Sequence, residues 1–142
     1  MLTGDLALSR MNMAAVFIVS GGEASRIMLA VKNVLSRVDL IPTLIFDEID
    51  TGVSGKASLA IANKLKAIAS AHQVLCVTHT AQIAAASDRG FVLTKKVANG
   101  NTETVCTVLD GANKTGEVSR LLSGSDSDSS LRLAEDLIKS FI

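Results

Sequence analysis

Two short, mostly apolar runs place the strongest constraint on how this 142-residue chain can fold. Residues 43–46 (TLIF) lead into Asp47 and Glu48, and residues 73–78 (QVLCVT) lead into His79. Continuous apolar runs of this length are typical of parallel strands buried on both faces. The segment between them has apolar residues at helical spacing. We therefore predict a right-handed strand–helix–strand unit within a parallel sheet.

The carboxyl ends of these strands are the expected place for chemistry, because ligands of open α/β sheets bind there. Asp47 and Glu48 follow the first strand, and His79 follows the second, just before a short alanine-rich helix predicted over residues 80–86. An acidic pair after a strand is also common as a helix cap, and a lone histidine is common as an ordinary hydrogen-bonding residue. Taken singly, these residues do not define a site.

The stretch VSGGEASR at residues 19–26 raises a separate question, because adjacent glycines weaken a helix. Ser20 and Glu23 have the spacing of a capping box ahead of a helix that begins near Gly21 or Gly22. Capping accounts for the serine and the glutamate but not for the glycines. Glycines at a helix start let a ligand approach the backbone, where free N–H groups favour an anion such as phosphate. From these residues alone, capping and phosphate binding both remain open.

Two amphipathic helices flank the first predicted strand. In the first, we expect the polar side chains Arg26, Lys32, Asn33 and Arg37 to point away from an apolar face formed by Ala24, Ile27, Met28, Val31, Val34, Leu35 and Val38. In the second, capped by Ser54, the expected buried residues are Leu59, Ile61, Ala62, Leu65, Ile68 and Ala69.

The C-terminal third changes pattern. Asn99 and Gly100 separate two extended runs, which predicts a β-hairpin from residues 91–97 and 102–109. We expect this hairpin to form an antiparallel edge of the sheet. A short helix over residues 114–122 and a solvated Ser/Asp loop over residues 124–130 should follow. The last helix should bury one stripe formed by Ala134, Leu137, Ile138 and Phe141.

Composition excludes several classes of function. The net charge is zero, so no general basic field points to nucleic acid, and Trp and Tyr are absent, which removes the usual stacking platforms for single strands. No run of eighteen apolar residues is present that could span a membrane. Cys76 and Cys106 lack zinc-site spacing, and we expect both to be buried free thiols in a cytoplasmic protein.

Three longer stretches occur in a fixed order and carry a family resemblance. SGGEASRIMLAVK begins at residue 20, IFDEIDTGVSG at 45 and QVLCVTHTAQIA at 73, with a weaker match in EVSRLLSG at 117. Together they resemble the C-terminal half of an ABC-type ATPase head, and more narrowly the RecN family of SMC-related bacterial repair ATPases. Three motifs in order are far more specific than any one of them. The resemblance implies an α/β fold, the C-terminal lobe of a P-loop ATPase head, with a parallel βαβ core, an antiparallel edge hairpin and C-terminal helices.

The resemblance also implies residue roles. Asp47 matches the Walker B aspartate that supports Mg²⁺, Glu48 the catalytic glutamate that polarises the attacking water, and His79 the switch histidine that senses the γ-phosphate. The signature motif, which in the family contacts ATP held by the opposite head, matches the nucleotide-binding candidates Ser20, Gly21, Gly22 and Glu23. The D-loop, which communicates across the head dimer, matches Asp50, Thr51, Gly52, Val53 and Ser54.

The implied ligands are ATP and Mg²⁺, and the implied partner is a second ATPase head, either another copy or an N-terminal half. DNA would be reached through the full-length protein, which the resemblance places in the cytoplasm and at the nucleoid. No membrane partner is implied.

The chain departs from the family in one important respect, because it contains no G-x-x-x-x-G-K-[ST] string to cradle phosphates. Residues 111–116 have the glycine spacing, but Glu117 stands where the lysine is needed, and residues 52–56 form too short a loop. Residues 1–19 match the family poorly, whereas residues 20–142 correspond to the C-terminal half of the head. The chain is therefore expected to be a fragment or truncated product, or to have a replaced start.

Two functions follow from this departure. The first is the signature and Walker B half of an ATPase for double-strand break repair and recombination, with ATP bound and hydrolysed between dimerised heads and this chain inactive alone for lack of Walker A. The second is a non-catalytic interaction module that docks on a full-length ATPase head. In either case, apolar surface uncovered by the missing lobe should favour self-association.

Overall fold

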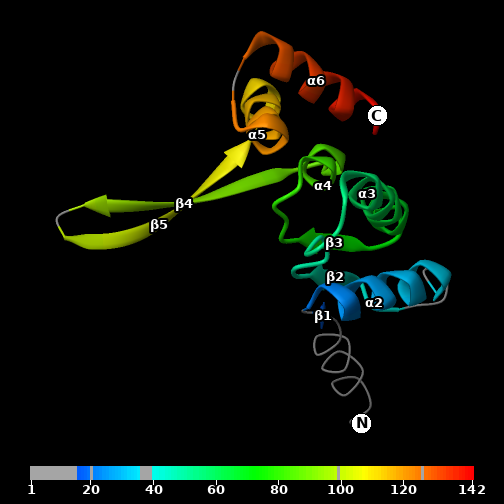
Figure 1. Ribbon diagram of the computed structural model, residues 1–142. Coiled ribbons are helices and arrows are strands. Elements are labelled where there is room, and N and C mark those ends of the chain that lie inside the picture. Colours follow the sequence, from blue (N-terminus) through cyan, green and yellow to red (C-terminus); the bar gives the residue numbers. More distant parts are fainter. Residues whose placement is uncertain (1–15, 20, 36–39, 99, 126) are drawn as a thin grey trace, which may run out of the picture. The chain divides into compact units, whose positions relative to one another are not determined.

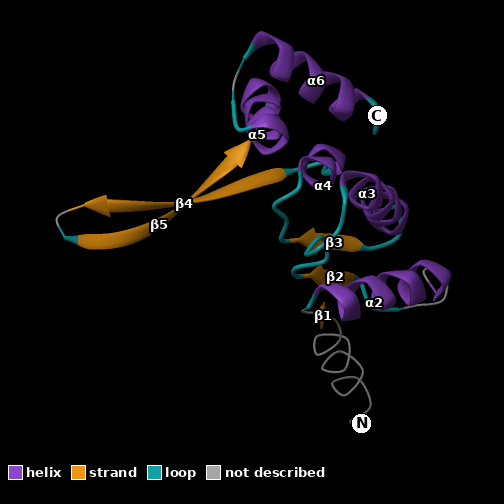
Figure 2. Cartoon of the chain, viewed as in Figure 1, coloured by secondary structure: helices purple, strands orange, loops and turns teal. Residues whose placement is uncertain are grey.

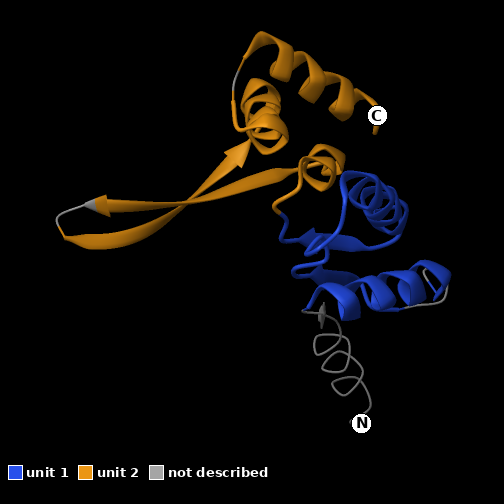
Figure 3. Ribbon diagram, viewed as in Figure 1, with its two compact units in different colours: residues 1–78 blue, residues 79–142 orange. Residues whose placement is uncertain are grey.

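The computed structural model describes residues 16–19, 21–35, 40–98, 100–125 and 127–142 (Figure 1). The chain separates into two compact units, one ending at Thr78 and the other beginning at His79 (Figure 3). In the ranges given, no helix combines the length and the apolar character that crossing a membrane requires.

The first unit is built on a three-stranded parallel sheet in the order β1-β2-β3 (Figure 2). Its strands are β1 (Val16–Val19), β2 (Thr43–Phe46) and β3 (Gln73–Cys76). Val16 pairs with Thr43, and Thr43 pairs in turn with Gln73, so the strands run in step. The βαβ prediction is confirmed, and β1 is an additional strand that the sequence analysis did not assign.

Two helices belong to this unit, α2 (Gly22–Leu35) and α3 (Gly55–Ala69). The central strand β2 buries Leu44 and Phe46 completely, and Ile49 beyond it is also fully buried. Helix α3 adds Ile61, Ala62, Leu65 and Ile68 to the apolar core of this unit, and α2 adds Leu29. The prediction for α3 was wrong for Leu59 and Ala69, which are exposed.

The buried face of α2 differs from the predicted one. The helix buries Ser25, Leu29 and Lys32, whereas Val34 is 79% exposed and Ile27 is 66% exposed. Polar contacts near Ser25 turn the helix so that positions 25, 29 and 32 face inward. Most of the predicted apolar stripe is then left exposed, although Met28 is half-buried. The predicted positions 37 and 38 lie outside the described residues.

Strand β3 is also less buried than predicted. It ends at Cys76 rather than at Thr78, and Leu75 and Val77 are exposed. Its burial alternates from residue to residue, so one of the two faces of this strand is exposed.

The second unit contains α4 (Ala81–Ala86), β4 (Gly90–Ala98), β5 (Asn101–Leu109), α5 (Gly111–Ser123) and α6 (Asp128–Lys139). The predicted hairpin is confirmed, with Phe91 opposite Val108. It forms a separate two-stranded sheet, so its assignment as an edge of the parallel sheet was wrong. The three helices bury a small core of Ala81, Ala85, Val118 and Ala134, against which Leu137, Ile138 and Phe141 pack as predicted.

The Ser/Asp segment is shorter as a loop than predicted, because α6 already begins at Asp128. Ser127 caps this helix by accepting a hydrogen bond from the backbone N–H of Ser130 at 3.3 Å. Ser130 itself is buried and bonds to the Ser123 hydroxyl at 2.9 Å. Serines that suggested a solvated loop therefore form a helix cap and a hydroxyl network.

Candidate functional site

The start of α2 is bonded to the turn that follows β2. The Ser25 hydroxyl donates to the carbonyl oxygen of Asp47 at 3.0 Å. One Arg26 nitrogen, Nη1, donates to the carbonyl oxygens of Ile49 at 3.2 Å and of Thr51 at 3.0 Å. Residues 25 and 26 thus join the glycine-rich helix start to the acidic turn, two motifs that lie more than twenty residues apart in the sequence.

The backbone of Glu48 adopts an unusual conformation. Its φ is +58°, and it is the one non-glycine residue with positive φ among those the structure describes. The left-handed region costs an ordinary residue about 1–2 kcal/mol, so it persists only where the surroundings impose it. The side chain is exposed, and the turn is closed by a hydrogen bond from the Thr51 N–H to the Glu48 carbonyl at 3.1 Å. Backbone strain concentrated on an exposed carboxylate is a common feature of functional sites.

Each glycine at the start of α2 has its own structural reason. Gly21 has φ +90°, which favours glycine, and its carbonyl accepts the Ser25 N–H at 2.9 Å. Gly21 therefore occupies the N-cap position predicted for Ser20, and it brings no side-chain acceptor of its own. A Cβ at Gly22 would lie 3.1 Å from the Glu48 carbonyl oxygen and 2.9 Å from Arg26 Nη1. Gly22 is thus required where the helix start and the turn approach each other.

The predicted D-loop residues are not equivalent. Asp50 is only 1% exposed, and one carboxylate oxygen, Oδ2, accepts a hydrogen bond from the Thr78 hydroxyl at 2.5 Å. Thr51, Gly52 and Ser54 are exposed, and Val53 is half-buried. Ser54 stands at the N-cap of α3 as predicted, but its side chain makes no capping hydrogen bond. Asp50 therefore fixes the base of the loop, and the exposed residues form its outer surface.

Cys76 lies at the end of β3, next to Phe46 of β2. The pKa of its thiol is raised from 9.0 to about 12, chiefly by burial and in smaller part by the nearby carboxylates of Asp50 and Asp47. This cysteine is half-buried rather than buried, and Cys106 on the hairpin is exposed, so the prediction of two buried thiols was wrong. A thiol held neutral beside two carboxylates is a poor nucleophile.

The structure brings together only some of the predicted site residues. Asp47, Glu48, Asp50, Gly21 and Gly22 all lie at one edge of the first unit, as the contacts above show. Glu23 is exposed on the first turn of α2, whereas Ser20 lies outside the described residues.

His79 is exposed and is the first residue of the second unit. It directly follows Thr78, which is bonded to Asp50 in the first unit. Its predicted role as the switch histidine stays a prediction.

Three residues in this arrangement were missed as site residues. Arg26 was assigned to the outward face of α2, and neither Ser25 nor Thr78 was singled out. A serine or threonine that donates a hydrogen bond to a carbonyl or carboxylate far away in the sequence belongs to no recognisable sequence pattern. Arg26 could have been suspected only from its position one turn after the glycine pair, where a long side chain reaches back over the helix start.

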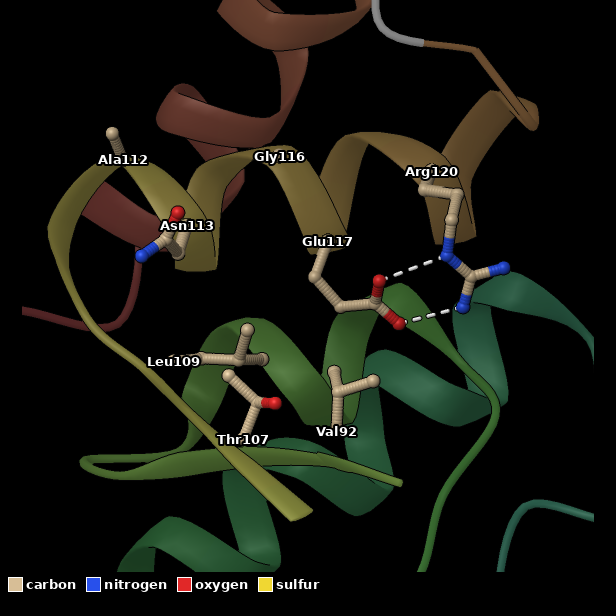
Figure 4. A pocket seen from close by; sticks show the side chains of 8 residues that line it. All are labelled: Val92, Thr107, Leu109, Ala112, Asn113, Gly116, Glu117 and Arg120. Carbon is tan, nitrogen blue, oxygen red and sulfur yellow. Dashed lines mark hydrogen bonds and ion pairs between the residues drawn. The ribbon is translucent and has the colours of Figure 1, made fainter. Parts of the chain in front are cut away.

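The second unit contains a cavity of about 420 Å³ between the hairpin and α5. Figure 4 shows Val92, Thr107 and Leu109 of the hairpin facing α5, on which the side chains of Glu117 and Arg120 are paired. The 111–116 segment forms the first turns of α5 and lines the cavity with Ala112, Asn113 and Gly116. It is helical, in agreement with the prediction that its glycine spacing does not make a phosphate loop.

The geometry defines the class of protein as α/β, with a small parallel sheet, an antiparallel hairpin and C-terminal helices. The polar residues of the candidate site lie at the carboxyl ends of the parallel strands. Comparison with known proteins gives the family. Over 123 residues the chain is 44% identical to the DNA repair protein RecN of Treponema pallidum and 40% identical to that of Bacillus subtilis, with 86% of this chain aligned in both cases. It is 41% identical to RecN of Deinococcus radiodurans over 121 residues, or 85% of the chain.

These similarities show that the chain belongs to the RecN family, as a piece corresponding to the C-terminal part of those proteins. The chain spans about a fifth of their length, since the alignments cover 22%, 21% and 21% of the three relatives. No protein-family model matches the chain, so the assignment rests on these pairwise similarities.

Proposed function

We propose that this chain is the signature and Walker B half of an ATPase head that acts in DNA repair. One observation carries the proposal: the glycine-started helix α2 is bonded to the turn that holds Glu48 at φ +58°. An anion-binding helix start and a strained, exposed carboxylate are the two elements that phosphoryl transfer would need from this half. The names of the relatives supply the repair context.

Asp47 fits as a protein ligand for Mg²⁺. It is half-buried at the carboxyl end of β2, and its carbonyl is fixed by Ser25. Magnesium in nucleotide sites is held by one or two carboxylates together with phosphate oxygens and water. The described residues contain no group of three or more His, Cys, Asp or Glu that could hold a metal alone. When bound, the ion would neutralise charge on the phosphates.

Glu48 is the candidate for orienting the attacking water. Its carboxylate is exposed beside Asp47, and the closed turn limits the directions in which it can point. A base for this step must lie within hydrogen-bond reach of the water, directly in line with the phosphate. Gly21 and Gly22 would present backbone N–H groups to the phosphate of a nucleotide held by another head.

ATP would therefore be held mainly by a partner, because this chain has no P-loop string. The partner would be a second head or an N-terminal half, and DNA would be engaged by the full-length cytoplasmic protein. The exposed stripe on α2 that includes Ile27 and Val34 supports a second candidate, a non-catalytic module that docks on a head through apolar surface. Both functions predict a partner, and only the first predicts turnover.

Mixing experiments separate the two functions. ATP turnover should be absent from this chain alone and from a separately expressed Walker A half of a RecN relative, and should appear when the two are combined. Arg132→Gln, a change at an exposed position of α6, should turn over like the unmodified chain. A stable complex without turnover would favour the docking module, and turnover by this chain alone would contradict both.

A further inference from the structure

Arg26 bridges two parts of the candidate site, although it is not among the residues to which the family resemblance gives a role. It lies on α2 one turn after Gly22 and is half-buried. Its Nη1 donates to the carbonyls of Ile49 and Thr51 at 3.2 and 3.0 Å. Hydrogen bonds from a charged donor are stronger than those between neutral groups, so this contact restrains the turn more than an ordinary side chain would.

The carbonyls that Arg26 binds belong to the turn that contains Glu48. That turn is closed by a hydrogen bond from the Thr51 N–H to the Glu48 carbonyl. The carbonyl of Thr51 in turn accepts a hydrogen bond from Arg26. Ile49, the second acceptor residue, is fully buried. Arg26 therefore restrains the Ile49–Asp50 and Thr51–Gly52 peptide groups, which follow Glu48 in the same turn and limit how far that turn can relax from φ +58° at Glu48.

Gly22 provides the space for this contact. A Cβ at residue 22 would meet Arg26 Nη1 at 2.9 Å, the Glu48 carbonyl oxygen at 3.1 Å and the Thr51 carbonyl oxygen at 3.2 Å. The missing side chain thus lets the guanidinium and the turn pack against the helix start. This requirement is independent of any ligand at the helix N-terminus.

We infer that Arg26 is a positioning residue, which holds the Glu48 turn in its left-handed conformation and fixes it to the helix start at Gly22. It acts through its hydrogen bonds to the backbone carbonyls of the turn. The inference deepens the proposed function and rests on it for the consequence in turnover. Its structural part concerns this chain alone.

The structural part is tested by amide hydrogen exchange on the isolated chain. Arg26→Gln should speed exchange of the Thr51 amide roughly tenfold, because a charged donor to the turn is lost. The amides of Leu44 and Phe46 in β2 should be unchanged, which separates a local effect from unfolding. Arg26→Lys, which keeps the charge but not the planar fork, should give an intermediate rate, and Arg132→Gln should have no effect.

The consequence for turnover is tested with the same variants combined with the Walker A half. Arg26→Gln should lower kcat about tenfold and change KM for ATP less than twofold, with partial recovery in Arg26→Lys. Unchanged Thr51 exchange would overturn the inference, and so would faster exchange with an unchanged kcat. If the unmodified pair shows no turnover, the proposed function fails and the role in turnover fails with it, while the exchange result still decides whether Arg26 holds the turn.

Discussion

Replacing Glu48 by glycine should make the first unit more stable while abolishing any turnover. Glu48 has φ +58°, which costs an ordinary residue about 1–2 kcal/mol and glycine almost nothing. Glycine also gives the unfolded chain more conformational freedom, which lowers the free energy of unfolding by roughly 0.5–1 kcal/mol. The exposed side chain contributes little packing, so the expected net gain in the free energy of unfolding is about 0.5–1 kcal/mol.

Native-state hydrogen exchange measures this gain, because the chain has no Trp or Tyr to report unfolding by fluorescence. The slowest amides of β2 should exchange roughly two- to fivefold more slowly in Glu48→Gly than in the unmodified chain. Glu48→Ala is the matched control, because it removes the same carboxylate and keeps the left-handed strain. If Glu48→Gly is no more stable than Glu48→Ala, Glu48 is not strained and the reasoning about the turn is refuted.

Three further predictions concern single residues. A thiol reagent should label Cys106 well before Cys76 at pH 8, because the pKa of Cys76 is raised to about 12; equal rates would contradict this. The Cys76 thiol of the unfolded chain ionises near pH 9.0, whereas the folded chain keeps this thiol protonated. In Mg²⁺-free buffer the free energy of unfolding should therefore fall as the pH rises above 9.0. The Cys76→Ala variant should show a smaller fall. Gly22→Ala should speed Thr51 exchange in the unmodified chain, but much less when Arg26→Gln is already present, and fully additive effects would rule out their coupling. Ser127→Ala should destabilise the start of α6 by about 1 kcal/mol, seen as faster exchange of the Ser130 amide, and no change would show that the cap is unimportant.

The central strand and its acidic end could be predicted from the sequence because their signals are local. The run TLIF is continuous and short, and the two acids follow it directly, which is what the structure shows for β2. The hairpin was equally clear, since Asn99-Gly100 favours one turn type between extended runs. The sequence did not show that this hairpin forms a sheet of its own, because no local signal indicates which sheet a hairpin joins.

The buried face of α2 shows where periodicity fails. Apolar spacing identifies the stripe that includes Ile27 and Val34, but the stripe is buried only if something covers it. In the described chain, the contacts of Ser25 and Arg26 with the turn decide which side faces inward. Those contacts link residues more than twenty positions apart, so no local pattern contains them.

The strain at Glu48 is likewise invisible in the sequence. A glutamate after a strand gives no sign of positive φ, because glycine or asparagine would be expected there. The closed turn, the Arg26 contact and the absent Cβ at Gly22 all involve residues of this turn and of the helix start, and none of them has a local sequence signal.

The central claim is that the Glu48 carboxylate serves ATP hydrolysis in a combined head, and one comparison tests it most directly. ATP turnover and ATP binding should be measured for this chain and for Glu48→Gln, each combined with the Walker A half. The Glu48→Gln pair should bind ATP as the unmodified pair does and lose turnover by at least about a hundredfold, as expected for removal of a general base. Turnover that survives Glu48→Gln unchanged would place the chemistry elsewhere and contradict the account.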